Sequence, residues 1–294
     1  MAVVRGSGAA ARIRRKRARV RSADKPAKPD KTSRRIEPHL ALLRAPKRQP
    51  APKPLAGELT VATYNVHRWT GLNGRSRPDP ARGCFVISEL QADVIALQEV
   101  LRPAQGEDPL ENLADALSLH VAFAATRAHR RGVIGNAILT RWPIAGLSML
   151  DLSYNRIEKR LAVAAQLQGE VPLDVVATHL ALSGRTRHRQ VQSLLEHPRL
   201  VNTPTLLLGD MNTWRRCKAS RSLDEELPAD RIDWPLSFPA AGPVLALDRI
   251  YARGVEILDV RAHDTPAARR ASDHLPVVAR VRAGVRPAEP DDSK

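Results

Sequence analysis

The chain has 294 residues, a formal net charge of +16 and two cysteines. This length suits one large domain or two small ones, and the apolar content is that of an ordinary globular protein. Two cysteines exclude a disulfide framework and favour free thiols, and no Cys/His spacing suits a zinc site. No run of about 18 apolar residues occurs and no apolar segment adjoins the basic N-terminus, so we expect a cytoplasmic protein without a membrane span or signal peptide.

The positive charge is concentrated at the N-terminus. Residues 1–53 contain 17 Lys and Arg against 3 Asp and Glu, which leaves 30 basic and 28 acidic residues in 54–294. Residues 1–56 lack a periodic apolar face, so we predict a basic disordered extension, with a short helix as an option at 36–44. An alternative role for this extension is to anchor the protein on an anionic polymer, such as nucleic acid, or on anionic lipid. The rest of the chain is nearly neutral, so its overall charge is no evidence of a DNA-binding face.

The folded domain is predicted to span residues 57–284, followed by a frayed C-terminal tail at 285–294. Apolar runs bounded by turn residues predict buried strands, which we expect at 58–64, 93–98, 120–125, 134–140, 144–151, 161–168, 172–178, 204–209, 247–252, 255–262 and 275–282. Helices are expected at 80–91, 110–118 and 184–196. Many strands with few helices indicate two sheets packed face to face and covered by helices. Residues 215–246 contain four prolines and are expected to be irregular, a kind of long loop that often carries function.

Five of the apolar runs adjoin polar residues that can bind a metal or a phosphate. Four runs end in such a residue and one begins with it, and the residues are Asn65, Glu99, His179, Asp210 with Asn212, and Asp273 with His274. A polar group at a strand end can stay hydrated, and strand ends can converge. Carboxylates, amides and imidazoles brought together in this way make a metal and phosphate site. The pattern therefore indicates a hydrolase.

Glu99 and the G-D-M-N segment carry the clearest chemistry. Glu99 follows V-I-A-L-Q, where an unpaired carboxylate is costly to desolvate. A Mg²⁺ ion, which takes one or two carboxylates plus water and substrate phosphate, removes that cost, and an ion pair with an arginine is the alternative. After the tight turn that Gly209 permits, Asp210 and Asn212 face the same side if the backbone stays extended. There they orient a water and hold a phosphate oxygen, and a plain turn is the alternative.

The S-D-H segment at 272–274 raises the question of a nucleophilic triad. Its residues are consecutive, so they cannot form a Ser-His-Asp relay, and no G-x-S-x-G elbow is present. His274 needs another carboxylate, for which we select Asp248 in A-L-D-R-I-Y. The alternative is that Asp248 forms a salt bridge with a nearby arginine. A His–Asp pair holds one tautomer and raises the basicity of the imidazole. His179 can donate to a phosphate oxygen or a leaving group, with a structural histidine as its alternative.

Seven segments carry a resemblance to a known family, and they are T-Y-N-V-H, A-L-Q-E-V, G-N-A-I-L-T-R-W-P-I, A-T-H-L, L-G-D-M-N, L-D-R-I-Y and S-D-H-L-P-V. In their order and approximate spacing, over about residues 57–283, the chain resembles the endonuclease/exonuclease/phosphatase superfamily. That superfamily includes pancreatic-type deoxyribonucleases, abasic-site endonucleases, inositol-polyphosphate phosphatases and neutral sphingomyelinases. G-D-M-N-T-W, S-F-P-A and L-D-R-I-Y look like a compact bacterial branch. The resemblance implies a four-layer α/β sandwich of two mixed β-sheets, with the site at one edge of the sheets.

The resemblance also implies roles for the metal and the water. Glu99 is the expected ligand of Mg²⁺, for which Mn²⁺ can substitute, with help from Asn65 and Asp273. Asp210 is expected to orient or deprotonate the attacking water. Asn212 and Asn65 are expected to hold the phosphate.

The remaining implied roles concern proton transfer and substrate contact. His274, paired with Asp248, is expected to act as base or transition-state donor. His179 is expected to bind a phosphoryl oxygen or serve the leaving group. Asn136 in G-N-A-I-L is expected to contact substrate or shape the floor of the site.

We therefore predict a Mg²⁺-dependent phosphodiester hydrolase acting on nucleic acid in an endonuclease-like manner. A phosphatase or phospholipase-type hydrolase acting on a lipid head group or small phosphoester is the alternative. A third option is a catalytically idle scaffold whose basic tail binds polyanions. R-A-H-R-R at 127–131 and R-T-R-H-R at 185–189 could grip phosphates, or be ordinary surface. The low aromatic content provides little stacking for unpaired bases.

Overall fold

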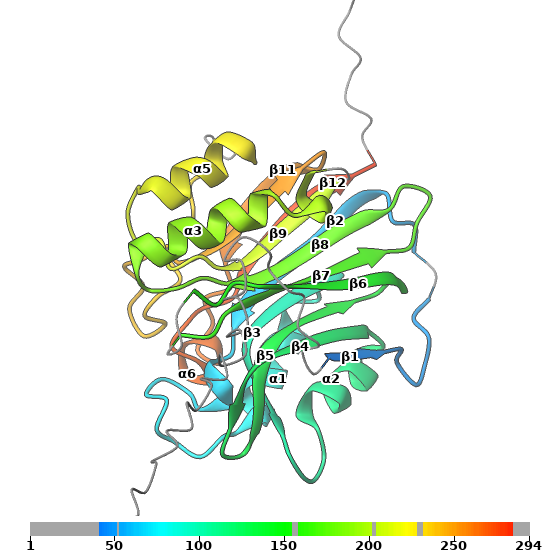
Figure 1. The fold of residues 1–294 in the computed structure, drawn as a ribbon. Helices are drawn as coiled ribbons and strands as arrows, with labels where there is room; N and C mark the ends of the chain where they lie inside the picture. The colour runs from blue at the N-terminus through cyan, green and yellow to red at the C-terminus, as the bar shows by residue number, and fades with distance from the viewer. Residues whose placement is uncertain (1–40, 52, 155–157, 202–203, 228–231, 285–294) are drawn as a thin grey trace, which may run out of the picture. The chain divides into compact units, whose positions relative to one another are not determined.

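The computed structural model describes residues 41–51, 53–154, 158–201, 204–227 and 232–284. The predicted C-terminal tail and most of the predicted N-terminal extension lie outside these residues. Within them, two sheets pack together in the region that begins at residue 41 (Figure 1). None of the helices in this described part of the chain is long and apolar enough to cross a membrane.

The first sheet has seven strands, in the order β1 (Ala41–Arg44), β4 (His120–His129), β5 (Gly132–Thr140), β3 (Val94–Pro103), β2 (Gly57–Asn65), β12 (Val277–Ala283) and β11 (Glu256–Ala262). The second has five, in the order β10 (Asp248–Arg253), β9 (Thr205–Asp210), β8 (Leu173–His179), β7 (Leu161–Leu167) and β6 (Ile144–Asp151). β2 and β3 are parallel, as are β8 and β9, and the other neighbours are antiparallel. Both sheets are therefore mixed, as predicted.

The helices in the described residues are α1 (Pro80–Glu89), α2 (Pro109–Leu117), α3 (Gly184–Leu195), α4 (Pro198–Val201), α5 (Lys218–Glu226), α6 (Ala268–Ala271) and the 3₁₀ turn η1 (His67–Trp69). The three predicted helices are present as α1, α2 and α3. The expectation that 215–246 is irregular was wrong for α5, which buries Ala219 and Leu223 at a spacing of four. α5 is short and mostly charged, so its apolar period is too brief to stand out in the sequence.

The folded region also begins earlier than predicted. β1 pairs with β4 from Ala41 to Arg44, so this part of the predicted disordered extension is a strand and not a helix. Leu55, also upstream of residue 57, is buried between the sheets. A four-residue strand on the edge of a sheet has too little periodicity to be recognised beside a basic, proline-rich segment.

Three apolar layers give the fold its four-layer arrangement. The central layer lies between the sheets and includes Val61 and Val94 from the first sheet and Val175 and Leu208 from the second. Successive residues of β3 point to opposite faces, and both faces are covered. Every residue from Val94 to Leu97 is therefore buried, which gives the continuous apolar run seen in the sequence.

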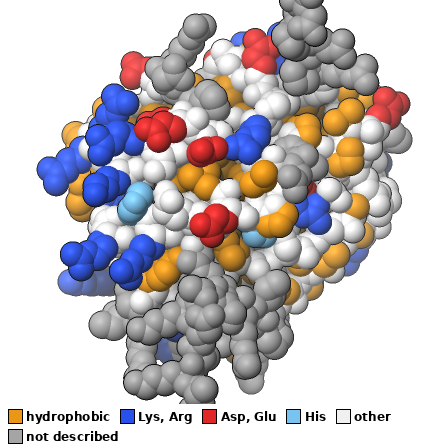
Figure 2. All heavy atoms as spheres, turned by 45° about the horizontal axis from the view of Figure 1, so that its top comes forward, with side chains coloured by type: hydrophobic (Ala, Val, Ile, Leu, Met, Phe, Trp, Pro, Cys, Tyr) orange, Lys and Arg blue, Asp and Glu red, His pale blue; other side chains and the backbone are white. Residues whose placement is uncertain are grey.

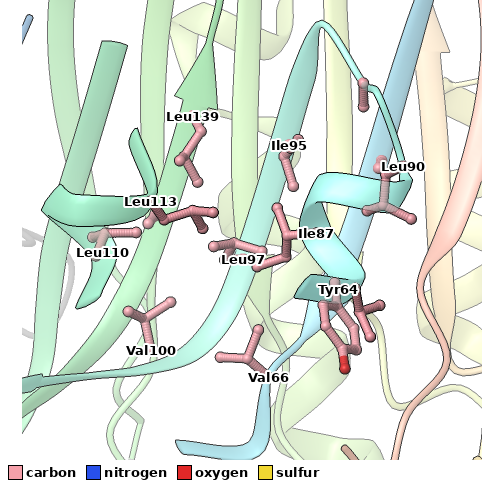
Figure 3. Packing of buried hydrophobic residues seen from close by; sticks show 14 of the residues in the cluster. Tyr64, Val66, Ile87, Leu90, Ile95, Leu97, Val100, Leu110, Leu113 and Leu139 are labelled. Atoms are coloured by element: carbon pink, nitrogen blue, oxygen red, sulfur yellow. The ribbon is translucent and has the colours of Figure 1, made fainter. Parts of the chain in front are cut away.

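The two outer layers join helices to the sheets. α1 and α2 pack through Ile87, Leu110 and Leu113 against Leu97 and Leu139 of the first sheet (Figure 3). On the second sheet, Val191 and Leu194 of α3 and Leu223 of α5 belong to one cluster with strand residues such as Val176 and Leu207. Helix, sheet, sheet and helix are therefore stacked in that order, which confirms the predicted four-layer α/β sandwich.

The central layer should dominate stability. Leu206→Ala removes a fully buried side chain between the sheets and should lower the free energy of unfolding by about 2–5 kcal/mol, since a cavity remains. Leu43→Ala is the matched control, because Leu43 is 53% exposed on β1, and it should change that free energy by less than about 0.5 kcal/mol. Urea unfolding followed by circular dichroism measures both. Equal losses in the two variants would contradict this layer assignment.

Candidate active site

Strand direction brings the polar strand ends to one edge of the two sheets. The parallel pairs β2–β3 and β8–β9 end at this edge, with His179 in register with Asp210. β10 runs antiparallel to β9 and begins there, so Asp248 lies opposite Asp210. β12 runs antiparallel to β2, so the segment leading into it, which includes His274, also reaches this edge. The predicted convergence of strand ends is therefore present.

Asp210 lies at the centre of the group. Its Oδ2 accepts a hydrogen bond from Asn65 Nδ2 at 3.2 Å, and its Oδ1 accepts one from the Asn212 backbone N–H at 3.0 Å. His179 Nε2 is 3.3 Å and His274 Nε2 is 3.7 Å from the same Oδ2. Burial raises the pKa of Asp210 to about 7, although the positive charge of His274 acts in the opposite direction. This carboxyl can exchange a proton near neutral pH.

His274 and Asp248 form the pair selected from the sequence. His274 Nδ1 is 2.8 Å from Asp248 Oδ2, and the Ser237 hydroxyl donates to the same oxygen at 2.6 Å. Burial by itself lowers the pKa of His274, but the negative charges of Asp248 and Asp210 outweigh it and raise the pKa to about 10. The Phe238 ring packs on the imidazole at a centroid distance of 4.9 Å. His274 is thus held in one orientation and is protonated at neutral pH.

His179 differs from His274 in its protonation. It is buried, and this burial lowers the pKa of His179 well below its usual range, with the positive charges of Arg160 and Arg127 acting in the same direction. His179 Nδ1 lies 4.0 Å from Glu99 Oε1. A neutral imidazole in this place carries one N–H donor between the two carboxylates. The two histidines of the site therefore supply different chemistry.

Glu99 does not end its strand, contrary to the sequence interpretation. β3 continues to Pro103, and a break in the β3–β5 register between Leu97 and Val100 marks a bulge at Glu99. Glu99 has a φ of 53°, an uncommon conformation for a residue with a side chain. Strained backbone of this kind clusters at functional sites, and a bulge re-aims the side chain that it carries.

A loop after β2 surrounds Glu99 and Asp273 with partners that sequence reasoning missed. Arg68 Nε is 3.3 Å from Glu99 Oε2, so the arginine pair weighed as an alternative is present. His67 Nδ1 is 3.1 Å from Asp273 Oδ1. Burial raises the pKa of Asp273, and the negative charge of Glu99 contributes to the rise. His67 stands in the quoted T-Y-N-V-H segment and Arg68 follows it, so proximity to a motif was the one available signal.

Asn212 and Asn136 are held by backbone groups. The expected extended backbone at Asn212 was wrong, since its φ is 51° and the segment turns, which is the alternative weighed from the sequence. Asn212 Nδ2 donates to Leu180 O at 2.9 Å and so joins the segments after β8 and β9. Asn136 Nδ2 donates to Leu161 O at 3.0 Å and joins β5 to β7 at this edge. A direct contact of Asn136 with substrate stays a prediction.

Two groups of residues offer ligands for a metal ion. Asp210, Asp248 and His274 present three ligand atoms that all lie within 4.8 Å of one another, so this buried group could hold a metal ion. However, His274 Nδ1 and Asp248 Oδ2 already bind each other. Glu99 and Asp273 are less buried carboxylates whose negative charges act on each other. Oxygen ligands with room for water suit Mg²⁺, so this second group fits that ion better.

Comparison with known proteins agrees with this geometry. The sequence profile of the Endonuclease/Exonuclease/phosphatase family matches residues 62–274, more than half of the chain. The chain belongs to this family. The uncharacterized protein YbhP of Escherichia coli (strain K12) is 29% identical over 251 residues, which cover 75% of this chain and 95% of YbhP. Members of the family are generally hydrolases that act on phosphoesters, and the family typically uses a divalent metal.

Solved structures share the fold of this family member. An endonuclease/exonuclease/phosphatase from Beutenbergia cavernae DSM 12333 has a TM-score of 0.64 at 22% identity, covering 79% of this chain and 73% of that chain. A family protein from Leptotrichia buccalis C-1013-b has a TM-score of 0.62 at 16% identity, covering 76% and 99%. The human Nocturnin catalytic domain with bound sulfate anion has a TM-score of 0.59 at 19% identity, covering 78% and 95%. At these identities the likeness concerns the fold.

Asp248 should control the pH at which the imidazole of His274 titrates. In the wild type the imidazole of His274 should stay protonated through neutral pH, because its pKa is about 10. Asp248→Asn removes a negative charge that raises this pKa, so the titration midpoint should fall by at least about 1 pH unit. NMR of the imidazole nitrogens measures the midpoint, with Asp259→Asn, on the exposed face of β11, as the control. A midpoint that is the same in both variants would show that Asp248 does not set the charge of His274.

Proposed function

We propose that this protein is a Mg²⁺-dependent phosphodiester hydrolase, with Mn²⁺ able to replace Mg²⁺, and that it cleaves nucleic acid in an endonuclease-like manner. The observation that carries this proposal is the convergence of a carboxyl with a pKa near neutrality, a protonated histidine and a neutral histidine at one edge. They are Asp210, His274 and His179. Family membership supports the reaction class. The cytoplasmic location stays a prediction from the sequence.

In this proposal Asp210 is the general base. A base works best when its pKa lies near the operating pH, and the carboxyl of Asp210 satisfies that condition because of its burial. It takes a proton from the attacking water while Asn65 and Asn212 hold its two oxygens in place. In-line attack requires the water oxygen, the phosphorus and the leaving oxygen to lie roughly on one line. The orientation of the water therefore matters as much as its deprotonation.

The histidines act on the phosphoryl group. His274 donates its Nε2 proton in a hydrogen bond to an oxygen on which negative charge grows, while Asp248 holds the ring through Nδ1. His179 donates its single N–H to a second phosphoryl oxygen or to the leaving group. Fixed donors in a buried site stabilise this charge without reorganising during the reaction.

The metal is proposed to lie beside these groups. Glu99 and Asp273 would hold Mg²⁺, with the Asn65 side-chain oxygen as a further ligand. When bound, the ion neutralises charge on the phosphoryl oxygens. Arg68 Nε lies 3.3 Å from Glu99 Oε2 in the structure, so this carboxylate already has a cation as its neighbour.

Positive charge near the site supports a nucleic acid substrate. The charges of Arg68, Arg127, Arg130 and Arg131 all act on His129 at the end of β4, and that of Arg127 also reaches His179. A cluster of Lys and Arg is seen at the left of Figure 2, the side on which α3 and α5 begin in Figure 1. Such residues bind a phosphate backbone without reading its sequence. In the 185–189 segment Arg187 is buried, so it is not one of the phosphate-binding candidates.

A specific observation favours a lipid head group as the second candidate substrate. Several large apolar side chains are exposed on loops that leave the site, namely Leu182, Trp214, Leu236 and Val244. The aliphatic members of this set, Leu182, Leu236 and Val244, do not stack on bases, but all four side chains can enter a lipid interface beside basic residues. Cleavage of phospholipid vesicles with inert nucleic acid would select this candidate over the first.

Three substitutions test the reaction. Asp210→Asn, His274→Ala and Glu99→Ala should each lower kcat by about 10²–10³ while the fold survives, because each removes a group that acts on the transition state or the metal. Asp259→Asn, the control, makes the same chemical change outside the site. Turnover of bis(4-nitrophenyl) phosphate and nicking of plasmid DNA are measured with and without chelator. Retained turnover in all three variants would overturn the site assignment.

The Mg²⁺ affinity of two variants shows which of the two ligand groups holds the ion. Glu99→Gln should weaken Mg²⁺ binding at least about 10-fold, as measured by calorimetry, because a neutral amide replaces a direct ligand and loss of even an outer partner of a metal site typically costs about 10–100-fold. Glu89→Gln, on α1 beside His263, is the matched control and should bind Mg²⁺ as the wild type does. If Asp248→Asn loses Mg²⁺ binding while Glu99→Gln keeps it, the ion lies in the buried group with Asp210 and His274 instead.

A further inference from the structure

Cys217 occupies the N-cap of α5, a position where an anion is stabilised. The backbone N–H of Ser220 donates to the Cys217 sulfur, and the Cys217 backbone N–H donates to the Ser220 hydroxyl at 3.0 Å. The free backbone N–H groups and the dipole at the start of a helix favour negative charge. Cys217 is a free, half-buried thiol, so reagents can reach it.

A buried arginine lies beside the same sulfur. Arg187 is 4% exposed, and its Nη1 donates to Ala181 O at 2.9 Å and Leu182 O at 3.0 Å. Its Nε has no hydrogen-bond partner, and no carboxylate in the described part of the chain forms an ion pair with it. A buried guanidinium without an anion is costly. The positive charge of Arg187 lowers the pKa of the Cys217 thiol, so an ionised sulfur would give this guanidinium the anion that it lacks.

The surface around Cys217 is also positive. Arg215, Arg216, Lys218 and Arg221 are exposed, and none of them forms an ion pair with a residue that the structure describes. The cluster of Lys and Arg in Figure 2 lies on this side of the molecule. Cations in the first turn of α5 oppose the helix dipole and so lower helix stability. The same cations favour a thiolate.

We propose that Cys217 is a modification site: a thiolate held by the start of α5 and by Arg187, which hydroperoxides oxidise to a sulfenic acid in preference to Cys84. Low-pKa cysteines of this kind occur at helix N-termini, next to arginine or lysine, in partly exposed positions. Burial raises the pKa of the Cys217 thiol, but the hydrogen bonds from Ser220 and the influence of Arg187 outweigh it and lower the pKa overall. Burial raises the pKa of Cys84 to about 11, so Cys84 serves as an internal comparison, a thiol that stays protonated at neutral pH.

The oxidation is a two-electron step. The sulfur lone pair of the Cys217 thiolate attacks one oxygen of the hydroperoxide, an S–O bond forms and the O–O bond breaks. The leaving hydroxide or alkoxide takes up a proton and departs as water or alcohol, so the sulfur is oxidised and the peroxide reduced. A group added to the sulfur must be accommodated against Arg187, which holds the carbonyls of the loop that follows His179.

The ionisation is tested by alkylation of the full-length protein. Rates of iodoacetamide labelling are followed for each cysteine by peptide mass spectrometry over about pH 5–10. At about pH 7, Cys217 should react at least about 10 times faster than Cys84, with an inflection below the roughly 8.5 of an unperturbed thiol. The inflection separates ionisation from mere access, since a more accessible but unperturbed thiol would titrate at the ordinary pH. An inflection at or above that pH overturns the proposal.

Two substitutions test the cause. Ser220→Ala removes a hydroxyl that accepts from the Cys217 N–H at 3.0 Å, donates to the Cys217 carbonyl at 3.1 Å and helps to lower the pKa of the Cys217 thiol. This variant should raise the inflection of Cys217, whereas Ser222→Ala, on the same helix, should not. Arg187→Gln should raise it further, and the serine pair decides the matter if that variant does not fold. The same inflection in both serine variants would contradict the assigned environment.

The oxidation itself is tested with hydrogen peroxide and the sulfenic-acid probe dimedone. The dimedone adduct should form on Cys217 of the wild type and be lost in Cys217→Ser, while Cys84→Ser should label as the wild type does. Labelling that favours Cys84, or labelling of neither cysteine, would overturn the proposal.

Discussion

Burial of the Asp210 carboxyl is the constraint on which the site edge depends. A buried carboxyl is costly unless polar groups surround it. Here those groups come from the ends of β2 and β8, from the turn after β9 and from the segment before β12. Asn65 and Asp210 are 145 positions apart in the chain. The same contacts therefore hold the two sheets in register at this edge and assemble the reacting groups.

The electrostatics of the site follow from small differences in burial and neighbours. His179 and His274 are both buried and both lie near Asp210, but the second carboxylate is much closer to His274. Asp248 Oδ2 is 2.8 Å from His274 Nδ1, whereas Glu99 Oε1 is 4.0 Å from His179 Nδ1. Burial therefore lowers the pKa of His179, whereas the two negative charges raise that of His274. A carboxyl between a neutral and a protonated imidazole can take up a proton while the charged ring donates a hydrogen bond. This arrangement supports hydrolysis with separate groups for the water and for the phosphoryl oxygens.

Backbone strain and charge placement mark the parts of the chain that work against stability. Glu99 adopts a left-handed conformation inside a strand, and the start of α5 carries cations where the helix dipole favours anions. Each lowers the stability of its own element. At Glu99 the strained backbone sets the orientation of a carboxylate at the proposed metal site. At the start of α5 the cations favour ionisation of the Cys217 sulfur. Departures from local preference thus point to chemistry.

The sequence by itself determined the strands, the main helices and the residues gathered at the edge, because alternation, apolar runs and strand-end residues are local signals. Asp248 as the partner of His274 also followed from it. It did not determine β1 or α5, whose periodic segments are too short, or the bulge that aims Glu99. Only the tertiary structure decided that His179 is neutral, that His274 is charged and that Arg187 lies beside Cys217. Those properties depend on burial and on charges brought close by folding, and the order of residues along the chain contains neither.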